Sequence, residues 1–234
     1  MYTTGKIATI AVLAMAINTA MAADSVDVKV IGTIVPAACT PAVTGGATFD
    51  YGTIPASTIP ADDYTVLGVK TLDFSITCDA SAKVALRGVD GKSNTAAKPI
   101  GKSFNDPDNT LIDARSWMFG LGAEEPGKLT GSYRMWIETP TVKLDGKAAG
   151  QALISSNLTS ASPTWAASPN QTVLITSPNN RYYAWSTDAT TAPASFTTMT
   201  GTLSVQAAIN KGSALDLTKA VHLDGVATVE LYYL

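Results

Sequence analysis

Hydrophobic and polar residues alternate along most of this chain, which is the pattern of β-strands with one buried face. The first alternating stretch is Val26–Ile34, where Val26, Val28, Val30 and Ile34 share one face and Gly32 stands in the same register. The same alternation predicts strands at Thr48–Ile54, Leu72–Cys78, Val84–Leu86, Trp117–Leu121, Tyr133–Ile137, Leu203–Ile209 and Val229–Tyr233. Short strands at this spacing predict a single all-β domain, built as a sandwich or a barrel.

The first 22 residues follow a different pattern. Met1–Lys6 carries a positive charge, Ile7–Ile17 is an apolar segment of 11 residues, and Ala20–Ala22 has the small-x-small form that signal peptidase recognises. The apolar segment is too short for a membrane-spanning helix, which needs about 20 residues. We therefore expect residues 1–22 to be a secretory signal peptide, with the exported chain beginning at Ala23.

Composition and charge narrow the classes of partner. The chain has 16 basic and 19 acidic residues, a net charge of −3, and only 15% charged residues. Lys and Arg form no cluster, which argues against a nucleic-acid-binding surface. A second long apolar segment does not follow residue 22, so we expect no membrane insertion of the exported chain.

Two cysteines, Cys39 and Cys78, occur in the sequence. Export to an oxidising compartment makes a disulfide between them the expected state. Closing a loop of this length contributes roughly 4 kcal/mol to stability in the chain-entropy model. A metal site would need more ligands than these two thiols and the single histidine, His222, supply, so we expect neither a metal nor another cofactor.

The sequence gives little evidence of a catalytic site. The sequence has no G-x-S-x-G nucleophile elbow and no glycine-rich phosphate loop that leads into a helix. Asn105–Asn109 is rich in oxygen ligands, but it lacks the glycine and the glutamate that an EF-hand calcium loop needs, so we interpret it as an acidic turn. We expect a protein that is not an enzyme.

Four features, in this order, resemble the subunits of chaperone–usher fimbriae. The first is the alternating run VDVKVIGTIVPAAC, which leads directly into Cys39, and the second is Phe49–Ile54, similar to the V-D-L-G-x-I strand of pilins. The third is Cys78 at the end of an alternating strand, and the fourth is Ala227–Leu234, with its penultimate tyrosine. The middle of the chain, roughly 90–195, matches these subunits only in general character.

The resemblance implies an incomplete immunoglobulin-like β-sandwich, the pilin fold, over residues 37–234. An N-terminal donor-strand extension, residues 23–36, precedes it. In such subunits the extension of one copy completes the sandwich of its neighbour by strand addition. The implied donor residues are Val26, Val28, Val30, Gly32 and Ile34, with Gly32 where the receiving groove is too narrow for a side chain.

The resemblance also assigns a role to the C-terminal strand. Val229, Leu231, Tyr233 and Leu234 would form one edge of the groove, where a periplasmic pilus chaperone docks. The outer-membrane usher then replaces the chaperone with a neighbouring pilus subunit. The implied function is that of a structural fimbrial subunit, exported through the periplasm to the cell surface and contributing to cell adhesion. Two features depart from the family pattern, because the chain is longer than most shaft pilins and ends in Leu234 rather than in a polar residue.

Two other interpretations stay open at this point. One is a free-standing secreted or periplasmic binding sandwich that owns all its strands, and the other is a small outer-membrane β-barrel. Short strands and a terminal leucine disfavour the barrel, whose strands need about 9–11 residues to cross a bilayer. Several aromatic residues could line a sugar site, but we interpret them as core and rim residues: Trp136, Trp165, Tyr182, Tyr183 and Trp185.

Overall fold

The computed structural model describes residues 29–33, 37–105, 111–113, 118–158, 163–168, 173–174 and 181–234. The chain divides into two compact units, Met1–Val35 and Pro36–Leu234. In the first unit the described residues 29–33 have no regular secondary structure, and Val30 and Ile31 are 95% and 92% exposed. The signal peptide and three of the predicted donor residues, Val26, Val28 and Ile34, lie outside the described residues.

The second unit is all-β, and the ladders between its strands are antiparallel. The strands are β1 (Cys39–Val43), β2 (Thr65–Val66), β3 (Lys70–Ala82), β4 (Val84–Asp90), β5 (Phe119–Gly120), β6 (Ala123–Glu125), β7 (Lys128–Leu129), β8 (Gly131–Ile137), β9 (Lys143–Leu144), β10 (Lys147–Ala148), β11 (Gln151–Ser155), β12 (Ala166–Ala167), β13 (Val173–Leu174), β14 (Tyr182–Ser186), β15 (Phe196–Ile209) and β16 (Ala227–Tyr233). The helices in the described part of the chain are single 3-10 turns: η1 (Ala56–Thr58), η2 (Thr139–Thr141) and η3 (Gly212–Ala214).

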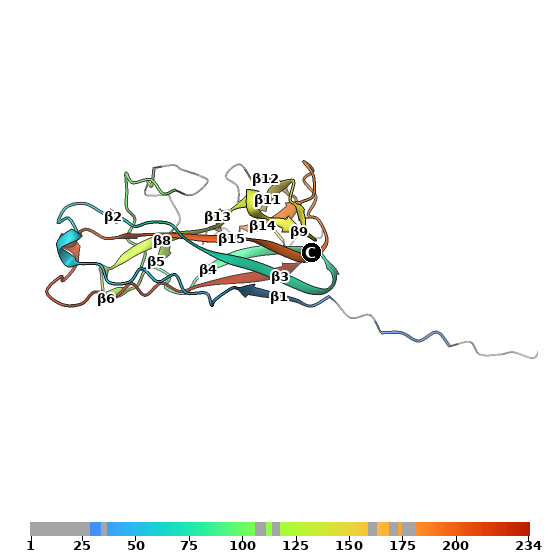
Figure 1. The fold of residues 1–234 in the computed structure, drawn as a ribbon, viewed down its shortest axis with the longest axis horizontal. Coiled ribbons are helices and arrows are strands. Elements are labelled where there is room, and N and C mark those ends of the chain that lie inside the picture. The colour runs from blue at the N-terminus through green and yellow to red at the C-terminus, as the bar shows by residue number, and fades with distance from the viewer. Residues whose placement is uncertain are drawn as a thin grey trace, which may run out of the picture. The chain divides into compact units, whose positions relative to one another are not determined.

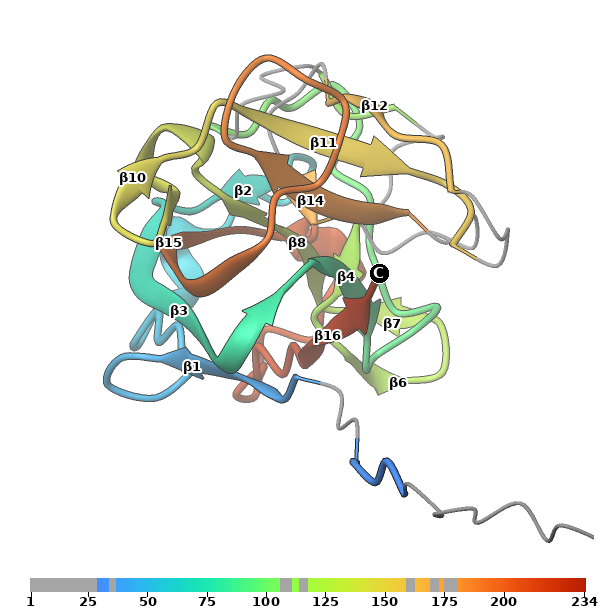
Figure 2. The same cartoon turned by 90° about the vertical axis from the view of Figure 1, so that its right-hand side faces the viewer.

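Within the described residues the strands form two main sheets. The larger sheet follows the order β1-β3-β15-β8-β13, with β2, β5, β9 and β10 attached at its margins. The smaller sheet follows the order β12-β11-β14-β4-β16, and β6 and β7 form a separate hairpin. Figure 1 shows the paired strands β3 and β15 running side by side along the unit. Figure 2 shows the larger sheet curling around, with its edge strand β1 and the edge strand β16 of the smaller sheet both in the lower part of the picture.

The core lies between the two sheets and is built mainly on β3 and β15, which pair in register from Leu203↔Leu72 to Met199↔Ile76. Along β3, Phe74, Ile76 and Cys78 are buried, while the residues between them are more exposed. This period of two arises because successive side chains of a strand point to opposite faces. The predicted strands around Leu72–Cys78, Val84–Leu86, Tyr133–Ile137, Leu203–Ile209 and Val229–Tyr233 are therefore confirmed as parts of β3, β4, β8, β15 and β16.

The strand predicted at Thr48–Ile54 is wrong. These residues have no ladder partner among the described strands, and a local turn takes the place of strand pairing. The Asp50 carboxylate accepts a hydrogen bond from the Gly52 N–H at 2.7 Å, and Gly52 adopts a φ of +66°. An Asx turn of this kind satisfies the backbone locally, so the segment does not need a neighbouring strand.

The predicted disulfide is confirmed. Cys39 and Cys78 face each other in the β1–β3 ladder, with their Cα atoms 4.0 Å apart and an S–S bond of 2.05 Å. The bond joins β1, the first strand of the unit, to β3, its neighbour in the larger sheet. β1 is thereby held as the outer strand of that sheet.

The aromatic residues of the middle region lie in the core, as interpreted from the sequence. Trp136, Tyr182, Tyr183 and Trp185 are between 1% and 6% exposed. Trp165 is half-buried against the cluster that contains Tyr182. Side chains so deeply buried do not form an open sugar platform.

Candidate functional site: a groove between the first and last strands

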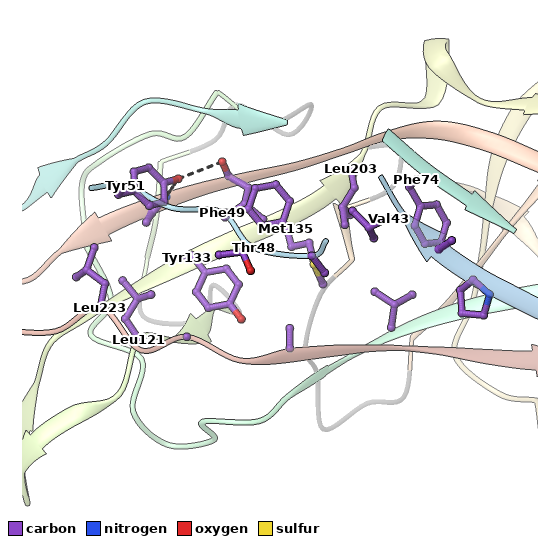
Figure 3. A pocket seen from close by; sticks show the side chains of 18 residues that line it. Val43, Thr48, Phe49, Tyr51, Phe74, Leu121, Tyr133, Met135, Leu203 and Leu223 are labelled. Carbon is purple, nitrogen blue, oxygen red and sulfur yellow. Dashed lines mark hydrogen bonds between the residues drawn. The ribbon is translucent and has the colours of Figure 1, made fainter. Parts of the chain in front are cut away.

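A cavity of about 520 Å³ lies between the facing edges of the two sheets. One wall is formed by Pro41–Val43 of β1 and the segment that follows it, and the other by Leu223–Val229, which leads into β16. The floor consists of residues from β8 and β15: Tyr133, Met135, Leu203, Val205 and Ala207. Figure 3 shows the labelled members of this set pointing into the space between the strands. We call the cavity with these walls the groove.

The groove exists because each of the two strands that border it, β1 and β16, is the edge strand of its sheet. In the described part of the chain β1 pairs with β3 alone, and β16 pairs with β4 alone. The outer edge of each strand therefore carries backbone N–H and C=O groups that no described ladder uses. Such an edge can pair with another extended chain.

Beyond one end of the groove a hydrogen bond joins its two bordering strands. The Cys39 N–H donates to the Tyr233 hydroxyl at 2.7 Å, which joins the beginning of β1 to the end of β16. Tyr233 is 52% exposed as a whole residue, whereas Val229 and Leu231 are half-buried and pack against the core. Leu234 is 43% exposed, and its N–H donates to the Lys83 carbonyl at 3.1 Å.

The rim opposite β16 is fixed by Tyr51. Its hydroxyl donates to the Val205 carbonyl and accepts a hydrogen bond from the Ala207 N–H, both at 3.2 Å. Val205 forms the last pair of β15 with β3, Val205↔Lys70, and Ala207 lies beyond it. Burial raises the pKa of Tyr51, so the phenol stays neutral and can both donate and accept. The anchored segment also places Phe49 half-buried against the core.

Tyr133 is a polar point on the apolar floor. Its side chain is 6% exposed and stacks on Phe119, with the ring centroids 5.1 Å apart. Burial raises the pKa of Tyr133, and the negative charge of Asp90 adds to this rise. The hydroxyl points across the cavity in Figure 3 and has no hydrogen-bond partner among the described residues.

A second cavity, of about 580 Å³, continues the groove beyond Tyr51. It shares Thr48, Phe49, Tyr51 and Leu223 with the first cavity and runs between Gly52–Ile59 and Leu215–His222. The two cavities are therefore neighbours, and the second lies beside the segment that precedes β16. His222, the single histidine, lines this second part.

The groove offers a ligand an apolar surface, and on each side of that surface lies the unpaired edge of a strand. Lys92 and Asp224, a charged pair near its open end, form an ion pair at 2.6 Å. Within the described residues, no three His, Cys, Asp or Glu side chains gather as a metal site would require. Also within those residues, the helices are too short and too polar to span a membrane.

The predicted site residues fall into three groups. Cys39 and Cys78 are brought together, and Val229 and Leu231 lie on β16 beside the groove. Val30 and Gly32 belong to the first unit, where an added side-chain atom at Gly32 would meet nothing within 4 Å. The remaining donor residues lie outside the described part. Sequence reasoning missed Tyr51 as an anchor and Tyr133 as a polar floor residue, since nothing in the alternation separates them from ordinary core tyrosines.

Comparison with known proteins identifies similar proteins, but the names of these proteins state no activity. Residues 28–134 match a family model described as "Protein of unknown function (DUF1120)". The chain is similar to "Protein GltF" of Escherichia coli (strain K12), with 29% identity over 96% of this chain and 95% of that protein. It is also similar to "Uncharacterized protein YhcF" of the same strain, with 26% identity over 92% and 93%. No solved structure matches the chain. The matching family model is not one of pilins, so the fimbrial resemblance stays a hypothesis.

Proposed function

We propose that this chain is a structural subunit of a chaperone–usher fimbria. Its second unit would be an incomplete immunoglobulin-like sandwich, and its groove would accept residues 23–36 of a second copy as the missing strand. The observation that carries the proposal is the groove itself, because it lies between two strand edges that no described ladder uses. A strand inserted there would pair with backbone on both sides and cover the apolar floor.

The dimensions of the groove support this occupant. The seven residues of β16 offer an edge of about 20 Å, and the second cavity adjoins the groove before the beginning of this strand. An extended Val26–Ile34 spans about 27 Å. Its alternation turns four aliphatic side chains and Gly32 to one face, and Asp27, Lys29, Ile31 and Thr33 to the other.

The proposed route to the cell surface rests on two further observations. Residues 1–22 have the form of a signal peptide, and the Cys39–Cys78 disulfide suits an oxidising compartment. The partners would be a periplasmic pilus chaperone, an outer-membrane usher and neighbouring subunits. The activity would be assembly and adhesion, with no catalytic step and no cofactor.

Periplasmic co-expression with a candidate chaperone tests this function. Two forms of the exported chain are compared, one complete and one lacking residues 23–36. We expect both to form a chaperone complex, and the complete form alone to give SDS-resistant ladders once chaperone is no longer in excess. A full-length variant with Val28→Asp and Val30→Asp controls for the length of the extension and should give no ladder. If both forms purify as stable monomers without chaperone, the proposal is wrong.

The burial of the groove floor favours a second candidate function. Leu203, Val205 and Ala207 are 3%, 5% and 1% exposed without any added strand. A unit that already covers its core in this way could be a free-standing secreted or periplasmic binding sandwich, with the cavity as the site of an apolar ligand. Stable monomers in the co-expression experiment would support this alternative.

A further inference from the structure

The two strands that border the groove offer different backbone groups to an added strand. Before β16 begins, Val226 bonds to the residue that follows β4, because its carbonyl accepts a hydrogen bond from Gly91 N–H at 2.8 Å. After β16 ends, Leu234 bonds to the residue that precedes β4, because its N–H donates to the Lys83 carbonyl at 3.1 Å. The backbone groups of a paired strand alternate between its two edges, so the even-numbered positions of β16 face β4. The odd-numbered positions face the groove, and none of them is a proline: Ala227, Val229, Leu231 and Tyr233.

The corresponding edge of β1 has few donors. The even-numbered positions face β3, since the N–H of Thr44, directly after β1, donates to that strand at 3.0 Å. The odd-numbered positions face the groove, and of these Pro41 has no N–H to donate. The N–H of Cys39 is already bonded to the Tyr233 hydroxyl. Of the three described odd-numbered positions, Val43 alone therefore offers a backbone donor to an added strand.

This difference between the edges matters because main-chain hydrogen bonds give strand addition its affinity. An added strand can pair with successive groove-facing residues of β16, whereas along β1 the ladder is interrupted at Pro41 and occupied at Cys39. A proline on an edge strand is one of the means by which proteins prevent that edge from pairing with other chains. The sequence thus leaves β16 open and restricts β1.

We propose that the strand added to the groove is held by backbone hydrogen bonds to β16, and that Pro41 restricts its pairing with β1. This inference rests on the proposed function, in which residues 23–36 of a second copy form the added strand. The extension can pair in this way, because Val26–Ile34 contains no proline and every residue of it keeps its N–H. Pro41 is in this account a specificity-determining residue, since it decides which wall of the groove holds the strand.

The first test measures binding of fluorescent peptides of residues 23–36 to the full exported chain by anisotropy. The receptor carries Val28→Asp and Val30→Asp, so that its own extension does not compete. One peptide is methylated at the backbone nitrogens of Val28 and Val30, and another at those of Lys29 and Ile31. Methylation removes the donor and keeps the side chain, and because backbone groups alternate between the edges, each peptide is blocked on one edge only.

We expect one methylated peptide, blocked on the edge that faces β16, to bind about 10- to 100-fold more weakly than the unmethylated peptide, the usual worth of two backbone hydrogen bonds. The other, blocked on the edge that faces β1, should bind within about 3-fold of it. An equal loss for both methylated peptides would overturn the one-sided pairing and leave the proposed function standing. Failure of the unmethylated peptide to bind would instead contradict the proposed function, and this inference with it.

The second test restores the missing donor with Pro41→Ala in the same receptor. The unmethylated peptide can then pair with β1 at this position, whereas the peptide blocked on the edge that faces β1 cannot. The ratio of their two affinities should therefore rise about 3- to 10-fold over its value for the receptor with Pro41. Pro126→Ala, in the exposed turn between β6 and β7, is the matched control and should leave the ratio unchanged. An unchanged ratio in Pro41→Ala would overturn the role of Pro41.

Discussion

The backbone N–H of Cys39 donates a hydrogen bond to the hydroxyl of Tyr233, 2.7 Å away, although the two residues are 194 positions apart. Cys39 is also joined to Cys78 by the disulfide, so this one residue of β1 is bound both to β3 in the larger sheet and to β16 at the edge of the smaller sheet. The two walls of the groove meet at this point. Toward Phe49 and Leu223 they separate and enclose the cavity.

Replacing Tyr233 with phenylalanine tests this junction. The change removes the acceptor of the Cys39 N–H and leaves the ring in place, so we expect a loss of about 0.5–1.5 kcal/mol in the free energy of unfolding. Hydrogen exchange of the Cys39 amide should become faster, while amides in the centre of β15 should keep their protection. Unchanged exchange at Cys39 would show that the hydrogen bond does not hold the two strands together.

Reduction of the disulfide should lower stability strongly. Removal of a native disulfide from a secreted domain typically costs about 2–5 kcal/mol. Urea unfolding with and without dithiothreitol measures this loss, and the Cys39→Ser, Cys78→Ser double variant is the matched control. The double variant should match the reduced protein and should not respond to dithiothreitol. A reduced protein as stable as the oxidised one would mean that the crosslink does not constrain β1.

Tyr51→Phe should destabilise the unit through the backbone of β15. The variant leaves the Val205 carbonyl and the Ala207 N–H without the hydroxyl that now pairs with both, and each unpaired buried group costs about 1–3 kcal/mol. We expect a lower urea midpoint than in Tyr64→Phe, where the hydroxyl lies outside the groove lining. Equal midpoints for these two variants would contradict the anchoring role of Tyr51.

Stability should fall at alkaline pH. Burial raises the pKa of Tyr51 and of Tyr133 above the ordinary tyrosine value of 10.0. The unfolded chain therefore releases these protons first, so their contribution is complete below about pH 10 and is lost as the pH rises through the folded-state pKa values. Each such group adds up to about 1.4 kcal/mol per pH unit in this range. The melting temperature of Tyr133→Phe should consequently fall less steeply above about pH 10 than that of the unchanged chain, and identical slopes would refute this linkage.

Gly32→Trp should block assembly without disturbing the fold of the chain that carries it. An added side chain at Gly32 meets no atom within 4 Å in this structure, so the melting temperature should not change. In the groove of a second copy, however, the indole would collide with the floor. Thr33→Trp, on the opposite face of the same segment, is the matched control and should still form ladders. Normal ladders from Gly32→Trp would show that the donor register is wrong.

The sequence predicted the long strands because their apolar side chains recur at every second position. In β3 this alternation matches the burial, since Phe74, Ile76 and Cys78 are buried and the residues between them are more exposed. In β8 and in Leu203–Ile209 of β15 every residue is buried, so the alternation there identified the strand but not the burial of its polar face. Strands of two residues, such as β9 and β10, are too short to show any period. Thr48–Ile54 alternates as a strand does, yet its turn at Asp50 and Gly52 satisfies the backbone without a partner.

The candidate site could be predicted only in part. The cysteine pair and the apolar face of β16 follow from the sequence, because both depend on residue type and periodicity. Tyr51 and Tyr133 do not, since an anchored phenol, an unpartnered phenol and an ordinary core tyrosine look alike in a one-dimensional pattern. These three kinds of tyrosine differ in whether backbone groups near the phenol hydroxyl are left unpaired by the neighbouring strands. That depends on contacts between distant parts of the chain, which a local sequence pattern does not show.

The most direct test of the account is hydrogen exchange of the exported chain with and without the peptide of residues 23–36. If the peptide inserts as a strand, amides of β1 and β16 gain protection together, while β12, the opposite edge of the smaller sheet, stays unchanged. A peptide with Val28→Asp and Val30→Asp should protect neither strand. Protection of β1 and β16 would establish the groove as the site of strand addition. The absence of protection there, or protection at another edge, would contradict the central claim.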